Sequence, residues 1–425
     1  MDLKQLGLED PPNLFSTEAW CSQVLRSIDE RTACFHKIRK AKHRDSSLRL
    51  GFRSAGKEKI CEARKNVKEA WKNLRSYSDI HRPFGMPSSG DEMMFTNILC
   101  KKKGRYVDTS MHTGYVHLIR QARHTLYIET QYFLGSSHLW TRQSGTRCGN
   151  LIPTEITLKI CEKIHRGERF TCYIVLPLWP EGIPESSTVQ AILHWQKLTM
   201  ESMYKHIAET LKRKGRSSDS AKDYLNFYAL AKRENVPDDN NTNTENSQSP
   251  LVSHGINVSL PRRTGRHLIY VHSKLLIVDD AVAVIGSANI NQRSMDGARD
   301  SEIGIASYQP AYLPTATSVP RGDVHGFRLH CWATITNTME EVFKDPSSIA
   351  CVRRINEIAE ENWETFISTQ PVEMDSHLIP YPIAIDEDGN VTARRVNGEG
   401  FFPDTKAPIL GTFTYSLPLP DLLTT

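Results

Sequence analysis

The amino-acid sequence predicts an α/β fold in which a mixed or largely parallel sheet is flanked by helices. The first observation behind this prediction is that segments with the apolar period of a helix alternate with short runs of β-branched and aromatic residues. The second is the composition, because 39% hydrophobic and 24% charged residues are typical of a globular protein. The third is the length of 425 residues, which is enough for one large or two ordinary domains with a buried core.

The middle of the chain contains consecutive helix–strand pairs. The segments expected to form helices place apolar side chains at helical spacing, whereas runs such as TLYIETQYF and FTCYIVLPL are rich in β-forming residues. The helices are expected at residues 115–123, 154–165 and 187–214, and the strands at residues 125–133, 170–178 and 224–230.

A polar segment then interrupts the pattern. Residues 235–261 begin with NVPDDNNTNTENSQSP, which is nearly free of apolar groups, and we expect a disordered surface insertion there. Beyond it, a turn at Asp279 and Asp280 separates two short apolar strands, expected at residues 275–278 and 282–285. A further strand is expected at residues 301–306, helices at residues 326–344 and 349–366, and a Pro-rich extended tail from residue 379.

The amino-terminal part of the chain is strongly basic. Residues 31–75 contain 15 Lys and Arg against 4 Asp and Glu, although the net charge of the whole chain is only +4. Within this stretch, the Lys-, Glu- and Ala-rich residues 57–75 predict a helix. Two interpretations stay open, namely a solvated helix face and a patch that binds an anionic membrane or a nucleic acid.

The cysteines and the hydropathy pattern bear on the cellular compartment. The nine cysteines are scattered and form no C-x-x-C pair, so we expect free thiols in a reducing compartment and neither a disulfide framework nor a zinc site. No run reaches the ~18–20 apolar residues of a transmembrane helix, and no apolar signal-peptide core follows Met1. We therefore expect a cytoplasmic protein that associates peripherally with a membrane surface.

The stretch VHSKLLIVDDAVAVIGSANINQRSMDGARDSE, residues 271–302, carries the strongest chemical signal. It contains His272, Lys274 and Asp279 at the spacing H-x-K-x4-D, and only this one of the 16 histidines has a lysine two positions later. Because residues i and i+2 of a strand share one face, His272 and Lys274 are expected to point into one pocket, while Ser273 points away.

These residue types suit phosphoryl transfer. An imidazole can attack phosphorus when it is neutral or protonate a leaving oxygen when it is protonated, and an adjacent ammonium stabilises charge on the non-bridging oxygens. Ser287 and Asn289 can donate further hydrogen bonds to the same phosphate, at a turn where Gly286 permits close approach. Asp279 is expected to hold the turn rather than to carry a proton. Glu302 is a candidate to orient an imidazole N–H and so to fix the tautomer.

Two strand ends supply further candidates, each with a structural alternative. At the first strand end, one interpretation is that Tyr132 and Phe133 pack in the core. The other is that Glu129 and Gln131 are polar groups of the pocket. Trp179, in the segment WPEG, is either a buried residue of a rigid turn or part of the rim of a lipid pocket.

Clusters of basic residues and histidines outside the motif also have two interpretations. Arg262, Arg263 and Arg266 form either a solvated cluster or a patch that recruits phosphate. His325 and His330 suggest a metal site, but no carboxylate or cysteine completes a plausible ligand set, so none is expected.

The motif resembles the HKD motif of the phospholipase D superfamily, and IYVHSKLLIVDDAVAVIGSANINQRSMDGARDSEI resembles the second HKD block of plant-type eukaryotic phospholipase D. The blocks YIETQYFLGSS, LPLWPEGIPESSTVQAILHWQ, HGFRLHCW and FFPDTKAPILG extend the resemblance over residues 110–425. WCSQVLRSID, residues 20–29, resembles the segment that follows the first HKD repeat. The resemblance implies a phospholipase D-like mixed sheet flanked by helices, with one HKD repeat of the usual two.

The sequence departs from the family pattern in three respects. It contains one H-x-K-x4-D repeat and no counterpart of the amino-terminal calcium- and lipid-binding domain, so we expect the other repeat to belong before Met1. The family's Glu-Asn-Gln-Tyr-Phe reads ETQYF here, which replaces an amide near the pocket by the hydroxyl of Thr130. The basic stretch 31–75 has no recognised counterpart and is interpreted as an insertion.

The resemblance implies three regions. Residues 1–110 are expected to be a partly disordered remnant of the linker after the first repeat, together with the basic insertion. Residues 111–345 form the catalytic repeat with the HKD motif, and residues 346–425 form a carboxy-terminal helix and an extended tail.

The mechanism that the resemblance implies needs two motifs. In the family, two HKD motifs meet across a pseudo-twofold axis, where one histidine forms a phosphohistidine and the other acts as general acid and then as base. His272 would take the acid/base role in a phospholipase D that converts phosphatidylcholine-type lipids into phosphatidic acid and a free head group. A homodimer partner or a missing amino-terminal half would supply the nucleophile.

The expected partners follow from the same resemblance. A phospholipid membrane surface is expected, and a nucleic acid is not. The motif requires no cofactor, although calcium dependence is common in the plant-type family. Two other functions stay open: a catalytically inactive lipid-binding fragment that uses the basic stretch, and a nuclease of the superfamily.

Overall fold

The computed structural model describes residues 107–140, 148–216, 218–235, 264–309, 322–370, 372–396 and 398–413. The chain divides into two units, residues 1–86 and 87–425, and every described residue belongs to the second unit. The predictions for the basic stretch 31–75 and its helix, for most of the polar insertion, and for Arg262 and Arg263 lie outside the described residues.

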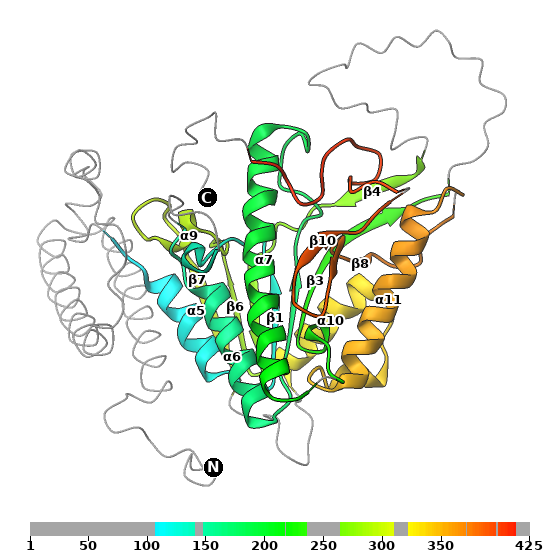
Figure 1. The fold of residues 1–425 in the computed structure, drawn as a ribbon. Helices are drawn as coiled ribbons and strands as arrows, with labels where there is room; N and C mark the ends of the chain where they lie inside the picture. Colours follow the sequence, from blue (N-terminus) through cyan, green and yellow to red (C-terminus); the bar gives the residue numbers. More distant parts are fainter. Residues whose placement is uncertain are drawn as a thin grey trace, which may run out of the picture. The chain divides into compact units, whose positions relative to one another are not determined.

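A mixed sheet forms the centre of the described part (Figure 1). Its strands are ordered β4-β3-β2-β1-β5-β6-β7, and β8 also pairs with β3. The strands are β1 (Thr125–Glu129), β2 (Thr171–Val175), β3 (Leu225–Arg233), β4 (Arg266–Ile269), β5 (Leu275–Val278), β6 (Val282–Gly286), β7 (Gly304–Tyr308) and β8 (Leu378–Pro380). Neighbours among β1, β2 and β3 are parallel, and the other pairs are antiparallel. The predicted mixed α/β fold is confirmed.

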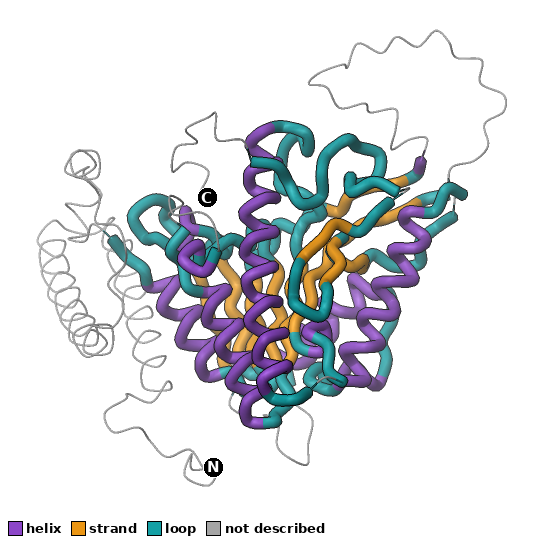
Figure 2. Tube along the Cα trace, in the orientation of Figure 1, coloured by secondary structure: helices purple, strands orange, loops and turns teal. Residues whose placement is uncertain are grey.

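Helices cover both faces of this sheet (Figures 1 and 2). The first face packs against α5 (Ser110–Gln121), α6 (Ile152–Arg166) and α7 (Ser187–Arg213), and the second against α10 (Asp323–Thr336) and α11 (Ile349–Ile367). Strand β1 shows the alternation that requires two layers. Leu126 and Ile128 belong to the core beneath α5–α7, whereas Tyr127 packs edge-on against Trp332 of α10.

Local sequence signals set the ends of the helices. Ser186 and Ser348 cap α7 and α11, since each side chain accepts a backbone N–H from the first turn, at 3.4 and 3.2 Å. Gly167 ends α6 with φ +73°, a left-handed conformation that glycine adopts without strain. The short helices are η2 (Ser137–Leu139), η3 (Ala221–Asp223), α9 (Gln292–Met295) and η4 (Glu341–Lys344).

The predicted helix at residues 326–344 is wrong as a single element. Helix α10 ends at Thr336, and the chain forms a separate short helix, η4, before α11 begins. The break lies at Asn337, whose φ of +50° is left-handed and therefore incompatible with a continuing helix. Phe343, which follows the break, belongs to the same core as Trp332, which precedes it. The apolar spacing in the sequence therefore continues across the break and predicted a single helix.

The predicted tail from residue 379 is also wrong, because this segment is built into the fold. It contains β8 and the hairpin β9 (Ile383–Ile385) and β10 (Val391–Ala393). Phe402, Ala407 and Ile409 are buried in the core beneath α5–α7. The strands have three residues each, which is too short for a clear alternation of polar and apolar residues. Strand β4 has four residues and was missed for the same reason.

Two further observations concern the described residues as a group. The five described cysteines, Cys148, Cys161, Cys172, Cys331 and Cys351, are free thiols. Among the described helices, none combines the length and the apolar character needed to cross a bilayer.

Because of His112 on α5, the free energy of unfolding depends on pH. Its Nε2 accepts the backbone N–H of Leu151 at 2.9 Å, and burial lowers its pKa to about 4 from the ordinary value of 6.5. The unfolded chain therefore binds this proton at a higher pH than the folded chain does. We expect the stability to be complete above pH 6.5 and to fall, by up to about 3 kcal/mol, as the pH drops towards 4.

Chemical denaturation between pH 4 and pH 8 measures this dependence. His112→Gln is the informative variant, because an amide oxygen can accept the same N–H without binding a proton. Its free energy of unfolding should change less with pH than that of the wild type. Equal slopes for the two proteins would show that His112 does not carry the effect.

Candidate active site

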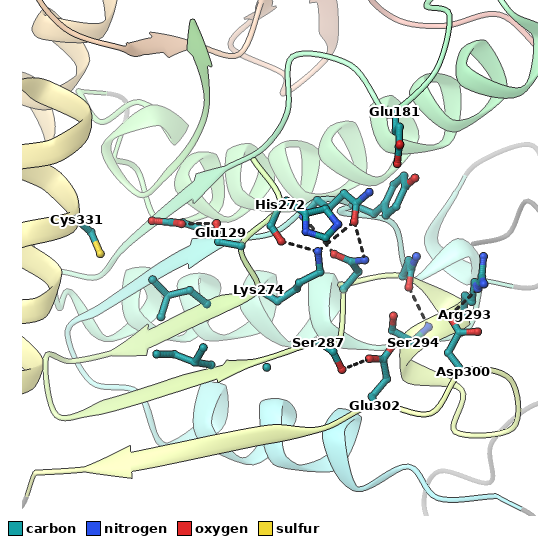
Figure 3. Close-up of a pocket in the computed structure, with 18 of the residues that line it drawn as sticks. Glu129, Glu181, His272, Lys274, Ser287, Arg293, Ser294, Asp300, Glu302 and Cys331 are labelled. Atoms are coloured by element: carbon teal, nitrogen blue, oxygen red, sulfur yellow. Dashed lines mark hydrogen bonds and ion pairs between the residues drawn. The ribbon is translucent and has the colours of Figure 1, made fainter. Parts of the chain in front are cut away.

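An open cavity of about 710 Å³ lies where several strands of the sheet begin or end (Figure 3). Because β1 is antiparallel to β5 and β6 is antiparallel to its neighbours, the end of β1, the start of β5, the end of β6 and the start of β7 share one edge. The motif residues and the candidates around them line this cavity together: Glu129, Gln131, His272, Lys274, Ser287, Asn289 and Glu302.

His272 and Lys274 lie in the segment between β4 and β5. The His272 side chain is exposed towards the cavity, with the Tyr270 ring 6.4 Å away between centroids. Lys274 is almost buried, at 9% exposure, and its Nζ donates to the backbone carbonyl of His272 at 2.5 Å. Ser273 was expected to point away, but it lines the same cavity. The alternation of a strand does not apply to it, since β5 begins only at Leu275.

The side chain of Gln131 positions the ammonium group of Lys274. Its Oε1 accepts from Lys274 Nζ at 3.1 Å and from Asn289 Nδ2 at 3.3 Å, while its Nε2 donates to the Tyr270 hydroxyl at 3.1 Å. Burial lowers the pKa of Lys274, and the carboxylate of Glu302 opposes this shift. Lys274 is therefore a partly desolvated cation, which interacts more strongly with a phosphate than a solvated lysine does.

Ser287 and Glu302 form a pair that the sequence did not predict. The Ser287 hydroxyl donates to the Glu302 carboxylate and accepts the backbone N–H of Ile303 at 3.0 Å. Glu302 was predicted to orient His272, but its hydrogen-bond partner in the structure is Ser287. Asn289, the second predicted phosphate ligand, bonds to Gln131. Both predicted phosphate ligands thus line the cavity while hydrogen-bonded to protein groups.

Gly286 lies where two strand backbones approach each other closely. A Cβ atom at this position would collide with the backbone of β7, at the carbonyl oxygen of Ile303 and at Cα of Gly304. This close approach of two strand backbones requires a residue without a side chain at position 286.

Asp279 does not line the cavity and has the structural position expected from its place in the turn. Its carboxylate accepts the backbone N–H groups of Arg123, His124 and Thr125 at 2.7, 2.7 and 2.8 Å. Burial raises the pKa of this carboxyl, and the three N–H donors oppose that shift. Asp279 and Asp280 both have φ of +53°, a left-handed conformation that Asp tolerates better than most residues.

The remaining pocket candidates divide into two groups. Glu129 lines the cavity, where its carboxylate accepts from Ser273 and, at 2.6 Å, from the Tyr127 hydroxyl. Phe133 is fully buried, as the core interpretation expected. Tyr132 is only half-buried and lines the cavity, so the core interpretation is wrong for this residue. Trp179 is outside the cavity and packs against Phe402, with 5.3 Å between ring centroids. The residue of the WPEG turn that lines the cavity is Glu181.

Arg266 is neither a solvated residue nor a phosphate ligand. Its guanidinium pairs with Asp404 at 2.7 Å and donates to the carbonyls of Phe366 and Ser368 at the end of α11, at 2.6 and 2.7 Å. The predictions considered only polar surface roles for this residue, because its partners are distant in the sequence.

Sequence reasoning also missed a buried cluster beneath the motif. Asp280 accepts two hydrogen bonds from Arg328, at 2.7 and 2.8 Å, and lies 2.6 Å from His325 Nδ1. This carboxylate is the partner of His325 that the sequence did not reveal, and Arg328 is fully buried. Within the described part of the chain, no group of three or more His, Cys, Asp or Glu could hold a metal ion.

Comparisons with known proteins bear on the family of the chain. The family model for phospholipase D matches residues 36–411. Phospholipase D beta 2 of Arabidopsis thaliana is 41% identical over 402 residues, which are 92% of this chain and 42% of that protein. Phospholipase D alpha 1 of Zea mays is 44% identical over 367 residues, 84% of this chain and 43% of that protein. Phospholipase D alpha 2 of A. thaliana is 45% identical over 333 residues, 77% and 40% respectively.

The fold and the site together define a class, namely a mixed α/β protein in which a histidine and a desolvated lysine share one open cavity. The comparisons define the family: the chain belongs to the phospholipase D family, and the predicted resemblance is confirmed. The chain spans less than half the length of these curated relatives.

Asp279→Ala tests the structural role of the motif aspartate. The substitution leaves three backbone N–H groups without their acceptor, so we expect a loss of roughly 3 kcal/mol in the free energy of unfolding. Asp279→Asn retains one acceptor oxygen and should lose less. Thermal and chemical unfolding followed by circular dichroism measure both variants. Wild-type stability of Asp279→Ala would contradict this role.

Proposed function

We propose that this chain supplies one half of a phospholipase D active site, which hydrolyses phosphatidylcholine-type lipids to phosphatidic acid and a free head group. The observation that carries the proposal is the exposed imidazole of His272 beside the Lys274 ammonium, which Gln131 positions in the same cavity. Because the substrates are bilayer lipids, the reaction would take place at a membrane surface.

His272 and Lys274 each have a role in this reaction. Lys274 would bind a non-bridging oxygen of the phosphodiester, where its charge stabilises the transition state. In the family mechanism, the partner histidine attacks phosphorus as His272 protonates the leaving head-group oxygen. His272 then removes a proton from the water that attacks the phosphohistidine, which releases phosphatidic acid and regenerates both histidines.

An exposed apolar surface beside the cavity supports a second half-site from outside these 425 residues. Ile285, Ile303 and Ile305 are 54%, 72% and 68% exposed, and Ile285 pairs with Ile305 across the β6–β7 ladder. Phe327 of α10 is 36% exposed, and both it and Ile285 line the cavity. We call these four residues the outer apolar face. A polypeptide that packs on it would reach the mouth of the cavity, and we propose a chain that carries the other H-x-K-x4-D motif.

Choline release from phosphatidylcholine in mixed micelles tests the catalytic roles. The assay mixes this chain with the part of the Zea mays relative that the present chain does not match. His272→Ala should reduce kcat at least 100-fold, the usual contribution of a general acid–base group. Lys274→Ala should reduce kcat/KM on a similar scale, because it removes charge stabilisation of the phosphate. Lys205→Ala on α7, an exposed lysine, is the control and should retain full activity.

The pH profile of the activity gives a second measure of the role of Lys274. Because burial lowers the pKa of Lys274, activity should decline at alkaline pH below the ordinary lysine value of 10.5. Lys274→Arg keeps the charge at that pH and should move the alkaline limit upward, even where its absolute rate is lower. If the mixture releases no choline at any protein concentration, the proposed activity is wrong.

The outer apolar face has its own test. Ile303→Asp and Ile305→Asp should weaken binding of the second half-site at least tenfold in analytical ultracentrifugation, whereas His272→Ala should leave binding unchanged. Leu158→Asp is the matched control, since Leu158 is 57% exposed on α6 and is not part of this face. If the chain alone dimerises through this face and is active, a second copy supplies the partner motif. Unchanged binding by both Asp variants would place the interface elsewhere.

A further inference from the structure

The cavity has a second polar end at Glu181, in the turn that follows β2. In the view of Figure 3, Glu181 lies on the opposite side of His272 from Ser287 and Glu302. Glu181 comes from the WPEG segment, whereas the predicted catalytic residues come from the segments next to β5 and β6. The proposed reaction assigns it no role, although it lines the same cavity as His272.

Within the described part of the chain, Glu181 is the carboxylate of this cavity for which no partner is seen. Four carboxylates line the cavity against three basic side chains, namely Lys274, Arg293 and His272. Glu129 accepts from Ser273, Glu302 accepts from Ser287, and Asp300 pairs with Arg293 at 2.6 Å. Among the residues that the structure describes, none forms a hydrogen bond or ion pair with the Glu181 side chain. A phosphate alone would add negative charge to a cavity whose carboxylates already outnumber its cations.

The position of Glu181 relative to Lys274 is set by hydrogen bonds. The backbone N–H of Glu181 donates to the Tyr270 hydroxyl at 3.0 Å, and Gln131 Nε2 donates to the same oxygen at 3.1 Å. Gln131 in turn accepts from the Lys274 ammonium at 3.1 Å. Two intervening side chains therefore connect the turn that carries Glu181 with the group that would bind the phosphate.

An aromatic ring accompanies this carboxylate. Tyr132 lines the cavity, and burial raises its pKa, with further contributions from Tyr270 and from the Glu181 carboxylate. Glu181 and Tyr132 line the same cavity, where the charge of Glu181 acts on the Tyr132 hydroxyl and the opposite charge of Arg293 counteracts it. A carboxylate next to aromatic rings is a favourable environment for a quaternary or primary ammonium group, because both the charge and the ring faces attract a cation.

We propose that Glu181 and the ring of Tyr132 bind the positively charged ammonium group of the lipid head group, and so determine head-group specificity at this active site. The inference rests on the proposed function, because it requires the phosphate to bind at Lys274. A cationic head group would offset the excess negative charge of the cavity, whereas a neutral polyol head group would gain no charge attraction from Glu181.

The test uses two soluble diesters that differ in the cation, glycerophosphocholine and glycerophosphoglycerol, titrated into the full chain by calorimetry. The wild-type chain should bind the choline diester roughly three- to tenfold more tightly. Glu181→Gln should remove this preference and leave the affinity for the glycerol diester unchanged. Lys274→Ala should weaken binding of both diesters.

Two further variants make the result specific. Glu185→Gln removes a charge from the same turn at an exposed residue outside the cavity, and its amide oxygen can still accept the Lys406 N–H. It should retain the preference for choline. Tyr132→Phe keeps the ring and should also retain it, whereas Tyr132→Leu should reduce it.

The outcomes separate this inference from the function on which it rests. If neither diester binds the wild-type chain, the phosphate site at Lys274 is wrong, and the proposed function fails with it. If both bind and Glu181→Gln leaves the preference intact, only the head-group assignment is wrong. An equal loss of preference in Glu185→Gln would also overturn it, because the effect would then be general electrostatics.

Discussion

The carboxylate of Asp279 joins the end of β5 to the start of β1, and the geometry of the active site depends on this junction. It accepts three consecutive backbone N–H groups, of Arg123, His124 and Thr125. Since β1 and β5 are antiparallel, with Glu129 opposite Leu275, the register set at one end of the pair determines which residues meet at the other. A shift by one residue would turn alternate side chains to the opposite face of the sheet.

At that other end, one amide organises the polar groups. Gln131 is buried and uses its oxygen for Lys274 and Asn289 and its nitrogen for Tyr270. These contacts connect segments that follow β1, precede β5 and follow β6. The partial burial of the Lys274 ammonium costs hydration energy, which the hydrogen bonds to Gln131 and to the His272 carbonyl offset in part. The site is therefore organised before a phosphate binds.

Much of the fold and the cavity could be predicted because the signals are local. The helix–strand alternation predicted the fold, and the H-x-K-x4-D motif with the residues that follow it predicted that His272, Lys274, Ser287 and Asn289 meet around one phosphate. The acceptor to which a hydroxyl donates is not determined by its neighbours in the sequence. Ser287 was therefore assigned to a phosphate, although it donates to Glu302. Partners remote in sequence were missed for the same reason, as Asp280 with Arg328 shows. Strands as short as β4 and β9 leave too little pattern to recognise.

Strand β7 has a practical consequence for the isolated chain. Within the described residues it pairs only with β6, and all five of its residues are exposed. A strand at the margin of a sheet offers unpaired N–H and C=O groups to any other chain, and apolar side chains beside it increase the tendency to aggregate. Preparations of the chain without a partner should therefore lose material to precipitation at high concentration. Stabilising additives that leave β7 accessible would not prevent this loss, so co-expression is the better route to homogeneous protein.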